Sequence, residues 1–422
     1  MKILVYPHDL RIGGSQINAI DLGAAVRDLG HDVAVFGQPG PLVESVRRAN
    51  LEFIPAPTPR KRPSPAAVRA LSGLVRRRGL DILHGYEWPP ALECLLASRL
   101  APGSLSVATV MSMSVAPFIP KTMPLVVGTA QILEAEAHYG RQRLQLLEPP
   151  VDVEVNSVQA VSNGRRFRRQ FGLEDNVKTI VCVTRLAVEL KLEGILSAMD
   201  AVAGLARNCD VRLVIVGDGP GMRIASAKAS SLNKELQRNI VVLTGELADP
   251  RGAYAVADIV LGMGGSALRG LSFGKPLVVQ GERGYWKLLT PETLPEFLWQ
   301  GWYGVGDRPE QGLPALTAIL APLLEDAAGR ERLGSFGRQV VEQRFSMQTA
   351  AQIQMGFYQK VLEGNVSTSS SLLADAAAAS RYVAYVGLRR FNRYFGQNAA
   401  DDFNASPVAS KLSRPVSARS AP

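Results

Sequence analysis

The sequence of 422 residues carries a formal net charge of +9, with 46% hydrophobic and 20% charged residues. This length allows two domains, and the composition is that of a globular protein. No apolar run is long enough to cross a membrane, and the apolar start of the chain is too short for a signal peptide. The three cysteines have no metal-ligand spacing, so no zinc site is expected and a reducing cytoplasm fits the sequence best.

The excess of basic residues restricts the expected partners to nucleic acid, an anionic membrane surface or phosphorylated substrates. No signature of a nucleic-acid-binding module is present and only 6% of the residues are aromatic, so nucleic-acid binding is not expected. One basic cluster lies at residues 59–79. It predicts either a loop followed by a solvated helix, or attachment to acidic lipid head groups.

In chain order, the first half alternates short apolar strands with helical patterns. A strand is expected at residues 2–7, then a glycine turn and an amphipathic helix over 13–30, which Gly30 ends. Further strands are expected at residues 31–37, 81–85, 105–112 and 125–129. This alternation predicts one doubly wound α/β domain with a parallel sheet.

The second half repeats this organisation after a change in composition. A Pro-Pro pair, turn residues and a basic run predict a linker around residues 148–175. The alternation then restarts, with a helix at 194–206 and strands at 178–185, 211–221, 239–246, 258–262 and 275–281. A helical region over 310–363 follows this second doubly wound domain.

The tail begins with a polar linker (365–371), which a helix over 380–396 and a basic end rich in Ser, Pro and Ala follow. This composition predicts that the end is disordered. The tail helix combines arginines and aromatic residues: Tyr385, Arg389, Arg390, Phe391, Arg393 and Phe395. It is expected either to help peripheral attachment to a membrane or to pack on the body of the protein.

Two similar domains in tandem direct attention to the loops that follow strands, because ligands bind beyond the carboxyl ends of parallel strands. Gly13 and Gly14 precede the first helix, whose start favours anions, although a plain glycine turn would look the same. The stretch "VGDGPG" (216–221) is a poor dinucleotide fingerprint and is more typical of a tight turn.

Two cations follow the strand at 178–185. Arg185 offers a planar fork and Lys191 a point charge, a combination that suits a diphosphate. Glu189 and Glu193 could instead hold both cations in ordinary surface ion pairs.

Taken together, the order and spacing of these stretches resemble the retaining glycosyltransferases of family four over residues 1 to about 362. The stretches that carry the resemblance are "GHDV" (30–33), "DILHGYEW" (81–88), "EPPVDVEV" (148–155), "TRLAVELK" (184–191), "LVIVGDGP" (213–220), "VVLTGEL" (241–247) and the terminal helix (344–362). The resemblance implies the GT-B architecture, in which two doubly wound Rossmann-like domains face each other across a cleft. The implied division is an acceptor-side domain (1–160) with a crossover helix (347–363), a nucleotide-sugar-binding domain (161–346) and a helical, then disordered, basic tail (364–422).

The resemblance also implies transfer of a hexosyl or other glycosyl group from a nucleotide sugar to a hydroxyl acceptor, with retention and without a metal or other cofactor. Arg185 and Lys191 would neutralise the charge on the departing nucleotide and are the implied catalytic residues. The implied donor-binding residues are Gly13, Gly14, Gly217, Gly245, Leu247, Gly264, Gly265, Ser266, Arg269 and Glu282. The implied acceptor-side residues are His84, Glu87 and Met111.

Three departures from the family pattern raise an alternative, a catalytically silent homologue that binds a nucleotide sugar. Arg269 stands where the family has a ribose-binding glutamate, the first glutamate of the usual pair is absent, and Met111 replaces a histidine. A cation at 269 would favour phosphate oxygens. A dinucleotide-dependent oxidoreductase is the third hypothesis, but its fingerprint is incomplete and gives the two cations of 184–191 no role.

Three local features leave two interpretations open. Glu282 could contact the ribose or be an exposed loop residue. His84 could face the acceptor or be a satisfied structural histidine. The aromatic-rich segment 284–307 could cap the donor site, although buried core aromatics are the favoured interpretation.

Overall fold

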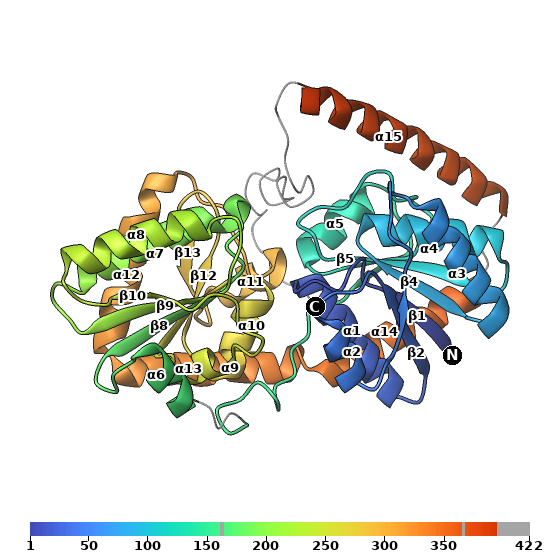
Figure 1. The fold of residues 1–422 in the computed structure, drawn as a ribbon. Coiled ribbons are helices and arrows are strands. Elements are labelled where there is room, and N and C mark those ends of the chain that lie inside the picture. Colours follow the sequence, from blue (N-terminus) through green and yellow to red (C-terminus); the bar gives the residue numbers. More distant parts are fainter. Residues whose placement is uncertain (161–163, 365–367, 395–422) are drawn as a thin grey trace. The chain divides into compact units, whose positions relative to one another are not determined.

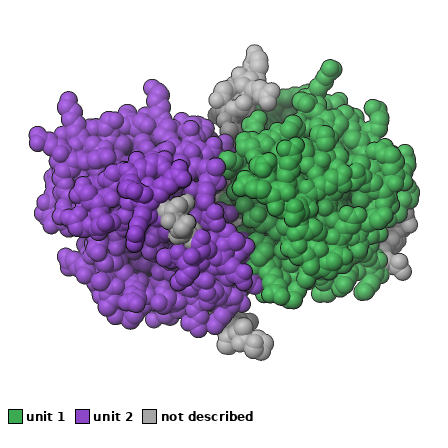
Figure 2. All heavy atoms as spheres, turned by 60° about the horizontal axis from the view of Figure 1, so that its bottom comes forward, with its two compact units in different colours: residues 1–149, 347–422 green, residues 150–346 purple. Residues whose placement is uncertain are grey.

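The computed structural model describes residues 1–160, 164–364 and 368–394. The chain forms two compact units, Met1–Pro149 with Met347–Pro422, and Pro150–Ser346 (Figures 1 and 2). The boundary between the two units lies after Pro149 and not, as predicted, after residue 160. The Val151 amide already belongs to the second unit, because it donates to the Phe345 carbonyl at 2.9 Å. Among the described residues, none of the helices combines the length and the apolar character needed to cross a bilayer.

The first unit is a seven-stranded parallel sheet in the order β3-β2-β1-β4-β5-β6-β7. Its strands are β1 (Lys2–Tyr6), β2 (Asp32–Gly37), β3 (Glu52–Pro55), β4 (Ile82–Tyr86), β5 (Leu105–Val110), β6 (Leu125–Val127) and β7 (Leu144–Leu146). Its helices include α1 (Gly14–Asp28), α2 (Val43–Arg48), α3 (Pro65–Arg78), α4 (Trp88–Leu100), α5 (Ala130–His138) and α14 (Met347–Glu363). The sheet confirms the predicted doubly wound fold.

Strand β1 shows how the sequence covers both faces of this sheet. Side chains alternate along a strand, so Ile3 and Val5 join the core under α1 and α14. Leu4 and Tyr6 point the other way, into the core under α3 and α4. The apolar run at the start of the chain therefore packs against helices on both sides, as a central parallel strand requires (Figure 1).

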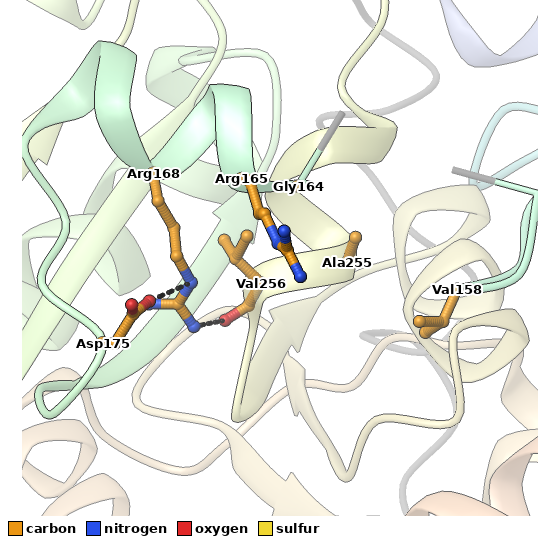
Figure 3. Close-up of a pocket in the computed structure, with 7 residues that line it drawn as sticks. All are labelled: Val158, Gly164, Arg165, Arg168, Asp175, Ala255 and Val256. Carbon is orange, nitrogen blue, oxygen red and sulfur yellow. Dashed lines mark hydrogen bonds and ion pairs between the residues drawn. The ribbon is translucent and has the colours of Figure 1, made fainter. Parts of the chain in front are cut away.

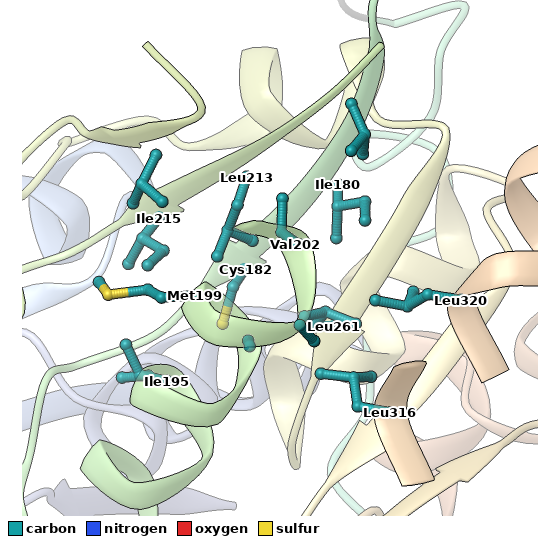
Figure 4. Close-up of a cluster of buried hydrophobic side chains, with 14 of the residues drawn as sticks. Ile180, Cys182, Ile195, Met199, Val202, Leu213, Ile215, Leu261, Leu316 and Leu320 are labelled. Carbon is teal, nitrogen blue, oxygen red and sulfur yellow. The ribbon is translucent and has the colours of Figure 1, made fainter. Parts of the chain in front are cut away.

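The second unit is a six-stranded sheet in the order β10-β9-β8-β11-β12-β13, in which β13 runs antiparallel to β12. Its strands are β8 (Lys178–Val183), β9 (Val211–Val216), β10 (Val241–Leu243), β11 (Ile259–Gly262), β12 (Leu277–Gln280) and β13 (Trp286–Leu288). Its helices include α6 (Gly164–Phe171), α7 (Glu193–Leu205), α8 (Met222–Glu235), α9 (Arg251–Val256), α10 (Gly265–Ser272), α11 (Leu294–Gln300), α12 (Gly312–Glu325) and α13 (Ala327–Arg344). Figure 4 shows the core on one face of this sheet, with Cys182 of β8 among side chains of α7, β9 and α12.

The tail helix α15 (Thr368–Tyr394) begins well before the predicted start at 380 and packs on the first unit. Its Asp375 pairs with Arg99 at 3.0 Å, and the Tyr382 hydroxyl donates to the Arg62 carbonyl. The ring of Tyr385 lies 4.9 Å from that of Phe118. The prediction that this helix packs on the body is confirmed. The side chain of Arg393, the residue Phe395 and the end predicted to be disordered lie outside the described residues.

Candidate functional site

Three loops meet at the carboxyl ends of β8, β9 and β10. The amide of Leu186 donates to the Asp218 carbonyl at 2.9 Å, and the amide of Gly221 donates back to the Leu186 carbonyl at 2.8 Å. The Gly217 amide donates to the Gly245 carbonyl, also at 2.9 Å. Residues from three separate predicted motifs are therefore fixed beside one another at the edge where ligands of parallel sheets bind.

The close packing of these loops requires a glycine at position 217. Its φ is +138°, and a Cβ there would lie 1.9 Å from the Thr184 carbonyl oxygen. A side chain would push away the loop that carries Arg185. The structure thus gives Gly217 a positioning role, whether or not it also approaches a ligand.

The segment between Arg185 and Lys191 is an irregular turn rather than a regular helix. Within Val188–Leu192, Glu189 has an extended backbone (ψ 146°) and Leu190 has a φ of +67°. This turn ends at the buried Leu192 and leads directly into α7.

Lys191 is partly buried, and Arg185 is exposed. Burial lowers the pKa of Lys191, and the charge of Arg185 lowers it further, while Cys182 opposes the shift. Among the described residues, neither cation has an ion-pair partner. The carboxylate of Glu193 instead accepts the amides of Arg283 and Gly284, at 3.1 and 2.7 Å. The interpretation that Glu193 ties up the two cations is therefore wrong.

Helix α10 follows β11, the strand that pairs with β8, and it therefore begins beside this group of loops. Gly264 has a φ of +56° and its amide donates to the Trp302 carbonyl at 2.8 Å. The Ser266 hydroxyl closes the turn by donating to the Met263 carbonyl at 2.9 Å. The amides of Gly265 and Ser266 lie in the first helical turn, where intrahelical acceptors are lacking.

Arg269 lies one turn further along α10 and is partly buried. Its charge acts on Tyr254, whose pKa is raised by burial and lowered in part by Arg269. Within the described parts of the chain, Arg269 has no carboxylate partner. A cation without a counter-ion thus stands where the family resemblance expects a carboxylate.

Glu282 is partly buried and accepts a hydrogen bond from the Tyr303 hydroxyl, so it is not a freely exposed loop residue. Burial and then Glu282 itself raise the pKa of Tyr303. The aromatic segment packs inward: Trp286, Phe297, Trp302 and Tyr303 are all buried, and the rings of Phe297 and Trp302 stack at 5.5 Å. The favoured interpretation of these residues as core aromatics is confirmed. Gly245 has a φ of +73°, and Leu247 follows it as a partly buried residue.

In the first unit, His84 is fully buried, so the expectation that it faces the acceptor is wrong. Its Nδ1 lies 2.6 Å from the Tyr358 hydroxyl, and its Nε2 lies 2.7 Å from the Thr109 hydroxyl. Burial lowers the pKa of His84 to about 3. His84 is a satisfied, neutral structural histidine that joins β4 to β5 and α14.

Glu87 lies directly beyond β4 with a φ of +66°. Its carboxylate accepts the Met111 amide at 2.9 Å, the Ser112 hydroxyl at 2.8 Å and the Ser15 hydroxyl at 3.3 Å. Two predicted acceptor-side residues, Glu87 and Met111, are therefore brought together beside the start of α1, where Gly13 is the N-cap and Gly14 the first helical residue.

Sequence reasoning missed His8 and Asp9, which follow β1 and lie at the same edge of the first sheet. The signal was present, because two titratable residues directly follow a predicted strand. In the described part of the chain, no group of three His, Cys, Asp or Glu residues is arranged to hold a metal ion.

A separate pocket lies at the opposite edge of the second sheet (Figure 3). It is lined by Arg165 and Arg168 of α6 and by Asp175 and Val256, which precede β8 and β11. Arg168 pairs with Asp175 at 3.5 Å and donates to the Val256 carbonyl at 3.3 Å. Its cation is neutralised, and the pocket is not part of the loop group described above.

Comparison with known proteins gives two family matches. Residues 13–172 match a model described as a glycosyl transferase 4-like domain, and residues 177–291 match one described as glycosyl transferases group 1. Over 127 residues the chain is 29% identical to an alpha-monoglucosyldiacylglycerol synthase from Streptococcus pneumoniae, and this match spans about 28% of each protein.

Solved structures share the fold at low sequence identity. A glycosyltransferase from Rickettsia africae is 15% identical, with a TM-score of 0.66 over 86% of this chain and 99% of that one. Anabaena HepE in complex with UDP is 17% identical, with a TM-score of 0.65 over 86% of this chain and 100% of that one. The matched domains and the shared architecture show that this chain is a glycosyltransferase family 4-like protein with the GT-B fold.

Proposed function

We propose that the protein transfers a glycosyl group from a nucleotide sugar to a hydroxyl acceptor, with retention and without a metal ion. The observation that carries this proposal is the pair Arg185 and Lys191, which have no ion-pair partner among the described residues at the ligand-binding edge of the group 1 domain. Support for the donor class comes from HepE, which was solved with UDP and with UDP-glucose.

The chemistry of the transfer explains why two such cations are needed. The bond between the sugar's anomeric carbon and the phosphate oxygen breaks, and negative charge develops on the departing diphosphate. A guanidinium fork and an ammonium group held in a partly buried site stabilise that charge, a role that metal ions fill in other phosphate sites. The family resemblance supports retention, and it requires no separate nucleophile.

The function is tested by incubating the purified protein with a panel of nucleotide sugars labelled in the sugar, with and without a lipid and polyol extract as the acceptor source. Donor-dependent labelling of an acceptor, or donor hydrolysis, is the expected result. Binding of UDP-glucose without turnover under every condition would support the silent homologue instead.

Arg269→Glu is expected to weaken binding of the nucleotide-sugar donor. The unpaired cation lies one turn into α10, and a carboxylate there would repel the donor's phosphates. The expected loss is about 5- to 150-fold in donor affinity, the cost of removing a partner from a charge-assisted hydrogen bond. Isothermal titration with the donor measures it, and Arg223→Glu, on the exposed surface of α8, is the matched control. An unchanged dissociation constant for Arg269→Glu would make this residue a mere surface cation.

We also propose that the protein attaches peripherally to the cytoplasmic face of a membrane through α15. Four large apolar side chains of this helix are exposed: Leu373 (77%), Val383 (68%), Leu388 (61%) and Phe391 (62%). Their spacing places them on one helix face, opposite the face of Asp375 and Tyr382 that packs on the body. An apolar face beside arginines such as Arg390 fits the boundary of an anionic bilayer.

The double variant Leu388→Glu, Phe391→Glu is expected to lose most binding to vesicles that contain phosphatidylglycerol. Sedimentation of the protein with these vesicles measures the effect, and vesicles of phosphatidylcholine alone test the role of lipid charge. Ile224→Glu is the control, because Ile224 is 45% exposed on α8 of the other unit. Equal sedimentation of the double variant and the parent protein would exclude α15 as the anchor.

A further inference from the structure

The backbone carbonyl of Lys191 is held from outside its own helix. Leu192 is the N-cap of α7, and the carbonyl of an N-cap accepts the first hydrogen bond within a helix. Lys191 lies one position earlier, so its carbonyl needs a partner from another part of the fold. That partner is Gln280, the last residue of β12, whose side-chain amide donates to it at 2.8 Å. A strand on the other side of the sheet's centre therefore fixes the backbone that carries this cation.

A glycine in α7 makes room for the side chain of Gln280, which is only 2% exposed. A Cβ on Gly194 would lie 2.4 Å from Nε2 of Gln280 and 2.9 Å from its Cγ. Gly194 lies in the first turn of α7, where its backbone does not require a glycine and alanine has the higher helix propensity. The packing of Gln280 is therefore the physical reason for a glycine at this position.

A second contact ties α7 to the tight turn that joins β12 to β13. The amide of Tyr285 closes this turn by donating to the Glu282 carbonyl at 3.2 Å, and the two residues between them have positive φ values, +53° for Arg283 and +77° for Gly284. Successive amides in such a turn form a concavity that binds anions. The carboxylate of Glu193 fills it, and accepts both amides at 3.1 and 2.7 Å.

The two contacts lie on either side of Leu192 and hold a backbone conformation that is unfavourable by itself. Leu190, directly before Lys191, has a φ of +67°. A residue other than glycine keeps such a conformation only where its surroundings enforce it. The bond from Gln280 follows Leu190 by one residue, and the contacts of Glu193 follow by three. These bonds therefore keep the Lys191 turn in place before any ligand arrives.

We propose that Gln280, admitted by Gly194, is a positioning residue that holds Lys191 in place for the diphosphate of the donor and acts on sugar transfer through that cation. Gln280 is buried and its amide is used by the Lys191 carbonyl, so it has no need to touch the donor itself. A misplacement of a reacting group by about 1 Å costs about 100-fold in rate. The effect on transfer rests on the proposed function, whereas the fixing of the turn does not.

A double-mutant cycle tests whether Gln280 acts through Lys191. Gln280→Met keeps the length and volume of the side chain but removes its hydrogen-bond donor. With the nucleotide sugar that supports transfer, Gln280→Met is expected to lower kcat about 10- to 100-fold in the parent protein. In the Lys191→Ala protein the same change is expected to lower kcat by less than about twofold, because the group that it positions is already gone. Equal losses in the two backgrounds would overturn the proposal.

Two glycine variants of the same helix separate the position of the side chain from its chemistry. Gly194→Ala displaces Gln280 without replacing it and is expected to reproduce the loss of Gln280→Met. Gly204→Ala is the matched control, because a Cβ there would meet nothing within 4 Å. Both changes favour the helix, so a general loss of stability is not expected from either. A kcat for Gly194→Ala that equals that of Gly204→Ala would contradict the proposed role of Gln280.

Hydrogen exchange of the protein without a donor distinguishes this proposal from the proposed function. The Leu192 amide donates to the Ala187 carbonyl at 3.1 Å and closes the Lys191 turn. In Gln280→Met this amide is expected to exchange about 5- to 150-fold faster, the cost of leaving a buried carbonyl without its partner, while exchange in β8 stays unchanged. Faster exchange in a protein without transfer activity would support the fixing of the turn and refute the function. Unchanged exchange would overturn the positioning role even where transfer is observed.

Discussion

Lys191→Ala is expected to lower kcat for sugar transfer by about 10²- to 10³-fold, the usual cost of removing one group that stabilises transition-state charge. Lys191 lies in a partly buried turn, where its interaction with a developing phosphate charge is stronger than in water. Its carbonyl is held by the Gln280 side chain at 2.8 Å, so the turn remains anchored when the side chain is shortened. Initial rates at saturating donor measure the effect.

The matched control is Lys178→Ala, at the other end of the same strand. Lys178 is 43% exposed and pairs with Asp258 at 3.7 Å, an arrangement that contributes little. Its replacement is expected to leave kcat within about twofold of the parent, since surface changes of this kind are within about 0.5 kcal/mol. Equal rates for both variants would show that Lys191 does not act on the leaving group.

Lys191 is also expected to lower the free energy of unfolding of the donor-free protein. Burial lowers its pKa in the folded state below the ordinary value of 10.5. The unfolded chain therefore binds more protons between the two pKa values, and stability rises with pH through that window. Below this pH window the cost of burying the charged lysine is fully present. Lys191→Met is therefore expected to raise Tm at neutral pH while it lowers kcat as strongly as Lys191→Ala does. A lower Tm for Lys191→Met would contradict a penalty from the buried charge.

The central elements of both sheets could be predicted because their signals are local. Strands such as β1 and β8 are short apolar runs bounded by polar residues, and Arg185 follows β8 at the edge where ligands bind. The edge strands β3 and β7 escaped prediction because they are short and only partly buried, so their sequences lack a clear apolar run. The start of α15 falls within the predicted linker (365–371), because its first four residues are a threonine and three serines, which are typical of a polar linker.

The roles of individual side chains depended on partners that are distant in sequence. His84 is buried and has as one hydrogen-bond partner Tyr358, which lies 274 positions further along the chain. Glu193 binds amides of a loop 90 positions away rather than its neighbouring cations. Local spacing therefore located the ligand-binding edges, but it could not decide which titratable residues at those edges were already satisfied.

Glu93→Ala is expected to destabilise the first unit by about 3–5 kcal/mol, the typical cost of leaving half of a buried ion pair. Glu93 is fully buried on α4 and accepts hydrogen bonds from the Arg62 guanidinium at 2.9 Å and from the Tyr6 hydroxyl at 2.8 Å. It also accepts the Ser64 amide at 2.7 Å. Alanine would remove the acceptor for all three donors and leave the arginine, only 15% exposed, without its counter-ion.

Hydrogen exchange of the β1 and β4 amides measures this loss within the first unit, where the expected change corresponds to about 150- to 5,000-fold faster exchange. Glu52→Ala is the control, because Glu52 pairs with Arg78 in an exposed ion pair and should change stability by less than about 1 kcal/mol. Since the Arg62 carbonyl accepts the Tyr382 hydroxyl, faster exchange should also reach α15 in Glu93→Ala but not in Glu52→Ala. Unchanged exchange in β1 and β4 would mean that the first unit does not depend on this buried pair.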